Sequence, residues 1–193
     1  MRIAVIASSK IPSNTANSIQ VMKVCQALTE LGNEVCLWVP GSTQANWEQL
    51  TRYYGISTTF PIYWVKTRNF AKRYDFALES VLKARSWKPD CIYTWMVQTA
   101  ALGGILGIPV LIEMHMLPSG VFGPKLFKFI LEMNEKKRIL SITNALITQL
   151  EQSYSVSIPN DIVRIAPMGF DAVQYRNLPE PDEARSKLGY QPD

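Results

Sequence analysis

The first 31 residues contain a short apolar segment, a polar loop and an amphipathic segment, in that order. The run from Ile3 to Ala7 has no polar alternation, which predicts a strand buried on both faces. Small or apolar residues then recur at three- and four-residue steps, which predicts a helix with one buried stripe. The stripe consists of Ser18, Val21, Val24, Cys25, Leu28 and Leu31. Asn17 or Ser18 is a suitable N-cap, and Gly32 is a suitable left-handed residue after the helix.

The same alternation continues along the chain. Further strands are expected at 34–40, 62–65, 91–95, 109–115, 139–142 and 162–166, and helices at 45–54, 70–86, 97–106, 123–137 and 143–154. The pattern predicts an α/β fold, a Rossmann-like, doubly wound and mainly parallel sheet of about seven strands. Residues 1–175 form this domain, and the proline- and acid-rich stretch within 176–193 reads as the start of a linker to a further domain.

Composition limits the class of protein. With 193 residues, 47% of them hydrophobic, the chain can bury one substantial core. Cys25, Cys36 and Cys91 each lie in a predicted strand or helix, which favours reduced thiols in a core. A single histidine and scattered cysteines offer no metal-ligand cluster, so no metal is expected. No signal-peptide pattern or run of transmembrane length is present, which indicates a cytoplasmic protein.

Positive charge is unevenly distributed. The net charge is +4, yet residues 66–88 alone hold seven basic and two acidic residues. Such a segment can bind phosphates, anionic lipid or nucleic acid, or can simply be the solvent-exposed side of a helix. Without an aromatic and basic RNA-binding motif, we expect no nucleic acid. A second segment could make peripheral contact with a membrane. The predicted helix within 123–138 could lie on anionic lipid through Phe127, Phe129, Lys125, Lys128 and Lys136, but a helix that covers the sheet is the favoured interpretation.

The carboxyl ends of the predicted strands gather the candidate site residues at one edge. The only histidine, His115, ends the strand at 109–115, and Glu113 lies two residues earlier on the same face. Most isolated histidines are structural. At the end of an apolar strand, however, an imidazole faces the ligand crevice, and Glu113 can fix its tautomer, so we favour a functional His115.

The loop after the first strand is the second candidate. Its small polar residues precede a helix, where the dipole and free backbone N–H groups favour an anion such as a phosphate, although a solvated capping loop is an equal alternative. The loop has neither GxGxxG nor GxxxxGK[ST], and the chain has no GxSxG and no Tyr-x-x-x-Lys pair. These absences argue against a dinucleotide-dependent oxidoreductase or epimerase, a P-loop enzyme and a serine hydrolase.

Several segments in order carry a resemblance to a known family: MRIAVIASS, ANSIQVMKVCQALTELGNEVCLWVP, PVLIEMH, RILSITNALITQL and VRIAPMGFD. From Arg2 to about Gly189 the chain resembles the N-terminal half of GT-B glycosyltransferases, in particular the large retaining family four. The resemblance implies two Rossmann-like domains facing a cleft, of which this chain is the acceptor-side one. The implied reaction transfers a sugar from a nucleotide diphosphate sugar to an acceptor hydroxyl with retention, and the chain alone is expected to be inactive.

The resemblance also implies roles for residues. His115 matches the histidine that contacts the donor sugar and supports the transition state. The loop residues Ser13, Asn14, Thr15, Ala16, Asn17 and Ser18 match the donor-diphosphate loop, although many members have adjacent glycines there. Lys66, Arg68, Trp95 and Glu113 occupy acceptor-side positions. No cofactor or metal is implied beyond the nucleotide diphosphate sugar, and the partners are an acceptor and the second domain. The alternative is a non-catalytic α/β ligand-binding or regulatory module.

Overall fold

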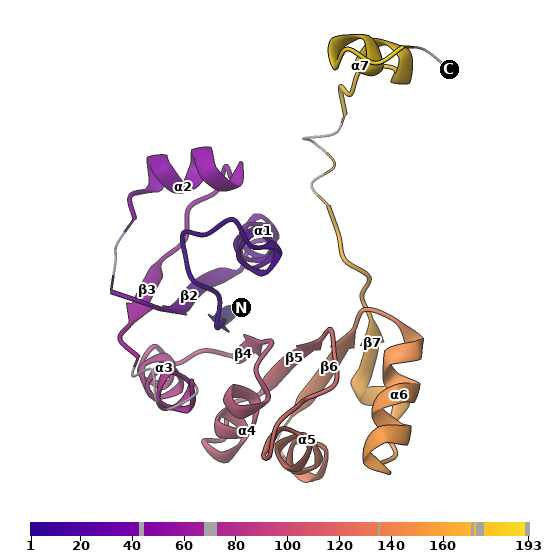
Figure 1. The fold of residues 1–193 in the computed structure, drawn as a ribbon. Helices are drawn as coiled ribbons and strands as arrows, with labels where there is room; N and C mark the ends of the chain where they lie inside the picture. The colour runs from indigo at the N-terminus through magenta and orange to yellow at the C-terminus, as the bar shows by residue number, and fades with distance from the viewer. Residues whose placement is uncertain (43–44, 68–72, 135, 171, 173–175, 192–193) are drawn as a thin grey trace.

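A computed structural model describes residues 1–42, 45–67, 73–134, 136–170, 172 and 176–191. Strands and helices alternate along the chain (Figure 1). The strands are β1 (Arg2–Ile6), β2 (Glu34–Pro40), β3 (Ile62–Val65), β4 (Cys91–Thr94), β5 (Val110–Met114), β6 (Lys137–Ser141) and β7 (Val163–Ile165). The helices are α1 (Ala16–Glu30), α2 (Trp47–Tyr54), α3 (Tyr74–Ser86), α4 (Val97–Ile105), α5 (Gly123–Glu132), α6 (Asn144–Tyr154) and α7 (Pro181–Lys187).

The described strands form one seven-stranded sheet in the order β3-β2-β1-β4-β5-β6-β7, and every neighbouring pair is parallel. This confirms the predicted α/β, Rossmann-like architecture. β1 lies between β2 and β4, so the direction of the connections reverses beside it. In open parallel sheets, ligands bind outside the carboxyl ends of the strands at this reversal. The topology therefore places a candidate site between the ends of β1 and β4.

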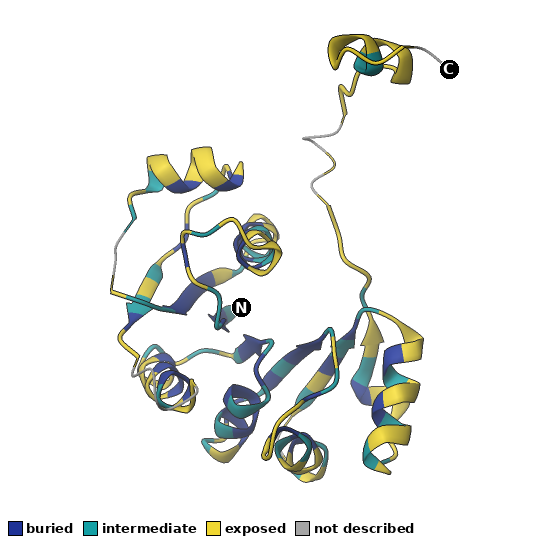
Figure 2. Cartoon of the chain, viewed as in Figure 1, coloured by how far each residue is buried: buried dark blue, intermediate teal, exposed yellow. Residues whose placement is uncertain are grey.

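Helices cover the sheet on both faces. Alternate residues of β1 point to opposite sides: Ile3 and Val5 pack with α1 and α2, whereas Ala4 and Ile6 pack with α3. On the same face as Ile6, Ile112 of β5 and Ile139 of β6 pack against α4, α5 and α6. The strands accordingly form the buried centre of the molecule (Figure 2). Parallel strands buried on both faces explain the continuous apolar runs in the sequence.

The start of α1 differs by two to three residues from the expectation. Thr15, not Asn17 or Ser18, is the N-cap, and its hydroxyl accepts a hydrogen bond from the Ser18 N–H. Leu31, expected in the buried stripe, is exposed. Gly32 has a φ of 81°, which confirms the predicted left-handed position.

Helix α5 is shorter and rotated relative to the expectation. It ends at Glu132 because Met133 is extended, and Lys137, expected as its last residue, begins β6 instead. Phe127 and Ile130 are fully buried, while Phe129 is exposed. The hypothesis that Phe127 lies on lipid is therefore wrong, since this side chain packs under the sheet.

Helix α3 also begins later than expected, at Tyr74, and Phe70 and Arg68 lie outside the described residues. Its buried side is Phe76, Ala77, Ser80, Val81 and Ala84. Tyr74, Leu78 and Leu82 are exposed. These three residues, spaced by one turn each, form an apolar row on the outer side of the helix.

The three cysteines are free thiols. Cys25 and Cys36 are fully buried, and burial raises the pKa of Cys36 to about 12. Both thiols therefore remain protonated at neutral pH and act as small apolar groups in the core.

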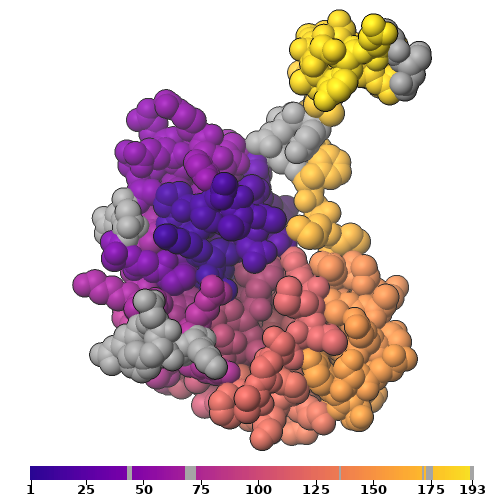
Figure 3. All heavy atoms as spheres, viewed as in Figure 1, coloured from indigo at the N-terminus to yellow at the C-terminus, as the bar shows by residue number. Residues whose placement is uncertain are grey.

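The C-terminal part of the chain leaves the sheet after β7. No residue of α7 is buried, and the helix stands apart from the rest of the molecule (Figure 3). The α/β body is therefore built without α7.

Candidate active site

A cleft of about 370 Å³ lies at the carboxyl ends of β1, β4 and β5. Its walls are the first loop and start of α1, the residues that follow β4, and the segment that follows β5. His115 is the first residue after β5 and lines this cleft, where the strand pattern predicted it. The imidazole retains 21% exposure of its side chain, so it is open to the cleft.

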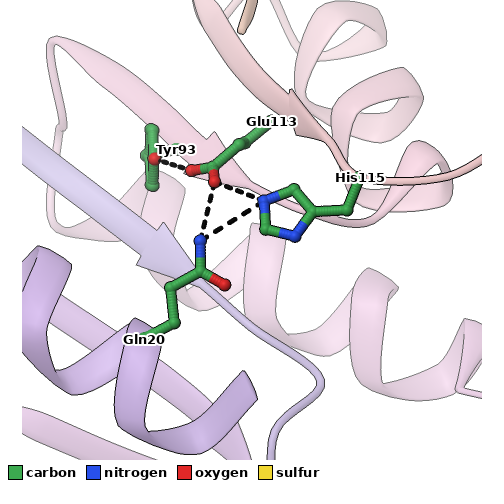
Figure 4. A network of polar contacts seen from close by, with 4 residues as sticks. All are labelled: Gln20, Tyr93, Glu113 and His115. Atoms are coloured by element: carbon green, nitrogen blue, oxygen red, sulfur yellow. Dashed lines mark hydrogen bonds and ion pairs between the residues drawn. The ribbon is translucent and has the colours of Figure 1, made fainter. Parts of the chain in front are cut away.

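Four polar side chains meet in the cleft: Gln20 from α1, Tyr93 from β4, Glu113 from β5, and His115 from the residue after β5 (Figure 4). The Oε1 atom of Glu113 lies 2.5 Å from Nε2 of His115 and 2.7 Å from the amide Nε2 of Gln20. Its other oxygen, Oε2, accepts a hydrogen bond from the Tyr93 hydroxyl. Both oxygens of a nearly buried carboxylate thus have partners inside the protein.

This network fixes the histidine tautomer. Because a carboxylate only accepts hydrogen bonds, the proton of the contact belongs on Nε2 of His115. Nδ1 has no hydrogen-bond partner among the described residues and is the nitrogen left for a ligand in the cleft. The sequence predicted that Glu113 fixes the tautomer, and the geometry confirms the contact.

Tyr93 holds the Glu113 carboxylate in place by a hydrogen bond from its hydroxyl group. It is buried in β4 and forms an edge-to-face contact with Trp95, with ring centroids 4.9 Å apart. Burial raises the pKa of the Tyr93 hydroxyl, and the adjacent Glu113 carboxylate raises it further. Tyr93 therefore remains a hydrogen-bond donor to Glu113 across the physiological range of pH.

The loop before α1 is held by its own hydroxyl groups. The Ser18 hydroxyl donates to the Ser13 carbonyl at 2.5 Å, and Ser13 Oγ lies 3.1 Å from Thr15 Oγ1. The Tyr54 hydroxyl accepts from the Ser13 N–H at 2.7 Å and donates to its carbonyl at 3.0 Å. Of the six predicted loop residues, Asn17 alone lines the cleft. The other five shape the loop that presents it.

The acceptor-side candidates lie in different places. Trp95 and Glu113 line the cleft, but the Glu113 carboxylate already has its three protein partners. Lys66 is exposed and is not among the cleft residues, and Arg68 lies outside the described ones. Of the three described candidates, the structure therefore brings two together in the cleft.

Gln20 and Arg73 line the cleft, although the sequence analysis did not single them out as candidates. Gln20 lies one helical turn after Asn17, so both side chains face the cleft. The spacing alone does not indicate a site residue, because it depends on knowing which side of the helix faces the cleft. Arg73, at the start of α3, adds a cation to the cleft lining. It was noted only as part of the basic segment 66–88.

The arrangement combines an oriented imidazole, an amide at a helix N-terminus, an aromatic wall and a cation. No group of three or more potential metal ligands occurs within the described ranges. Such a site can bind a polar, hydroxyl-bearing or anionic ligand and can offer it one hydrogen-bonding nitrogen of defined tautomer.

Comparison with known proteins identifies the fold. No family model and no curated protein sequence matches the chain. Among solved structures, a glycosyltransferase from Rickettsia africae ESF-5 aligns with a TM-score of 0.67 and 11% identity, over 100% of this chain and 51% of that one. The chain has the fold of one half of a GT-B enzyme.

Two further structures show how widely this fold is used. MurG of Acinetobacter baumannii aligns with a TM-score of 0.53 and 14% identity, over 88% of this chain and 46% of that one. A UDP-GlcNAc 2-epimerase from Neisseria meningitidis aligns with a TM-score of 0.56 and 12% identity, over 86% and 46%. The chain thus spans about half the length of its structural neighbours. At this identity the likeness shows the fold and leaves the reaction to be argued from the site.

Proposed function

We propose that this chain is the acceptor-side half of a GT-B glycosyltransferase that moves a sugar from a nucleotide diphosphate sugar to an acceptor hydroxyl with retention, in the manner of family four. The observation that carries the proposal is His115, oriented by Glu113 in a cleft at the carboxyl edge of a GT-B half. The donor nucleotide then belongs to a second, C-terminal domain facing this cleft.

In the proposed reaction, the bond between the anomeric carbon and the diphosphate oxygen breaks, and its electron pair leaves with the nucleoside diphosphate. The acceptor oxygen forms the new bond on the same face, and its proton passes to the departing diphosphate. Nδ1 of His115 accepts a hydrogen bond from a hydroxyl of the donor sugar and orients the sugar while positive charge develops on the ring. No metal or cofactor is part of the proposal.

The remaining cleft residues have supporting roles in this proposal. Asn17, at the N-terminal end of α1, lies where the helix dipole favours the diphosphate. Trp95 offers an aromatic wall to the acceptor, and Arg73 offers a cation to an anionic group. Glu113 acts through His115 and not by contact with the acceptor, because its oxygens are engaged.

The configuration of the product tests the proposal. In a protein that joins this chain to a donor-binding domain, transfer from an α-linked nucleotide sugar is expected to give an α-glycoside, read from the anomeric coupling by NMR. Release of nucleoside diphosphate should require an acceptor. A β-linked product would contradict retention. Conversion of the nucleotide sugar into its C2 epimer would instead support the epimerase function, and binding without turnover would support the non-catalytic module.

The 193-residue chain by itself is expected to fold but to transfer no sugar, because in this proposal the donor site lies on the second domain. Circular dichroism checks the fold, and transfer of a radiolabelled sugar to candidate acceptors checks the activity. Addition of a donor-binding domain should restore transfer. Robust transfer by the isolated chain would overturn the two-domain assignment.

A further inference from the structure

Exposed apolar side chains gather where the start of α3 meets the loop before α5. The Tyr74 and Phe122 rings contact each other edge to face, with centroids 6.2 Å apart, which joins the two elements. Leu78 follows Tyr74 by one turn of α3, and Phe129 follows Phe122 by two turns of α5. We name this surface the α3–α5 patch; it consists of Tyr74, Leu78, Val121, Phe122 and Phe129, all exposed. The helices that carry it lie on one face of the sheet (Figure 1).

The loop that carries Val121 and Phe122 is fixed at its base. The Tyr154 hydroxyl donates a hydrogen bond to the Pro118 carbonyl at 2.5 Å. A Cβ on Gly123 would lie 2.9 Å from the Pro118 carbonyl carbon, so only glycine allows the loop to close this tightly. Val121 and Phe122 are therefore presented outward from an anchored base, and they have not collapsed onto the body of the domain.

Basic side chains border the patch. Exposed Lys125 and Lys128 lie between Phe122 and Phe129 in the sequence, and Arg73 precedes Tyr74. The acidic groups on the same helices are Asp75, Glu79 and Glu132. Glu79 is paired with Lys83 at 2.7 Å, and Glu132 is in the last turn of α5. Apolar side chains flanked by cations are complementary to an anionic lipid surface, where the rings enter the headgroup region and the cations meet phosphates.

We propose that the α3–α5 patch docks this domain on an anionic lipid bilayer with the mouth of the cleft at the membrane surface. None of the described helices is long and apolar enough to cross a bilayer, so the contact is peripheral. The loop bearing the patch starts at His115, and its first five residues line the cleft. If the proposed transferase function holds, the acceptor hydroxyl is then carried by a membrane lipid.

Vesicle binding of the 193-residue chain tests the patch. The chain is expected to co-sediment with vesicles of equal parts phosphatidylglycerol and phosphatidylcholine, to bind phosphatidylcholine vesicles far less, and to lose affinity as salt rises. The double variant Val121→Asp with Phe122→Asp should weaken binding by about tenfold or more. A matched control is Leu31→Asp with Leu188→Asp, because Leu31 is 78% exposed, as is Val121, and Leu188 is 73% exposed.

Charge reversal of the lysines beside the patch tests vesicle binding independently. Lys125→Glu with Lys128→Glu should weaken binding by about tenfold or more, whereas Lys136→Glu with Arg138→Glu, at the opposite edge of the sheet, should leave it nearly unchanged. Three results would each overturn the proposal: no binding to the anionic vesicles, equal losses in patch and control variants, or a dimer in sedimentation that the Val121 and Phe122 changes disperse.

The single histidine reports where the cleft lies. With bicelles that carry a headgroup-linked gadolinium lipid, the imidazole signals of His115 should broaden in the wild-type chain and remain sharp in the Val121→Asp, Phe122→Asp variant. Sharp signals from bound wild-type protein would show that the cleft faces away from the membrane. His115→Ala should bind vesicles as the wild type does, so failure of the catalytic assignment and failure of the docking proposal are distinguishable.

Discussion

Replacing His115 by alanine is expected to slow sugar transfer about 10²- to 10³-fold in a protein that joins this half to a donor-binding domain, the usual cost of losing one preorganised hydrogen-bonding group. The imidazole keeps 21% exposure of its side chain, and without it the Glu113 carboxylate still accepts hydrogen bonds from Gln20 and Tyr93. The thermal midpoint should therefore change little. Initial rates with saturating nucleotide sugar measure the effect, and wild-type turnover in this variant would remove His115 from the site.

Two amide variants of His115 distinguish the roles of its two ring nitrogens. The Asn side chain places an oxygen near the position of Nδ1, whereas the Gln side chain reaches the position of Nε2, which faces Glu113. Because Nδ1 is the nitrogen left for the ligand, His115→Asn is expected to retain more activity than His115→Gln. The reverse order would show that the ring turns over when substrate binds and that Glu113 is not its partner in the reacting complex.

The sequence was sufficient for the fold because its strands are short apolar runs separated by helices with clear polar sides. It failed in detail where several residues satisfied the same rule. Thr15, Asn17 and Ser18 are all good N-caps, and only the closed hydroxyl cluster of the loop selects Thr15. Near the middle of α5, the segment LFKFIL is apolar on most of its circumference, so periodicity did not determine that Phe127 packs inward and Phe129 outward.

The candidate site was predicted in part for similar reasons. His115 and Glu113 could be found because strand ends in a parallel sheet converge at one edge. Gln20 and Tyr93 could not, because a polar residue in a helix and a tyrosine in a strand are common and nothing in the sequence pairs them with a residue some 90 or 20 positions away. The missing Tyr-x-x-x-Lys pair argued against one type of epimerase, but the GT-B fold is itself shared by an epimerase, so only the reaction decides.

Glu113→Leu is expected to destabilise the chain by about 2 to 4 kcal/mol, because the buried Tyr93 hydroxyl and the Gln20 amide lose their acceptor. Glu113→Gln keeps an acceptor of the same shape and should cost less. Chemical denaturation measures both. Tyr93→Phe is the matched change on the other side of the contact, and a double-mutant cycle with Glu113→Gln should show coupling between the two residues.

The NMR signal of the His115 imidazole in the Glu113 variants shows whether Glu113 orients the ring, independently of the stability of the fold. A proton shared between Nε2 and a carboxylate at 2.5 Å should give a downfield imidazole signal protected from exchange with water, and the only histidine of the sequence makes its assignment unambiguous. The signal should move upfield in Glu113→Gln, where the acceptor is neutral, and vanish in Glu113→Leu. An unchanged signal in Glu113→Leu would show that another group holds the ring. Loss of the signal together with a fall in kcat, while KM for the acceptor is kept, would identify Glu113 as the residue that positions His115.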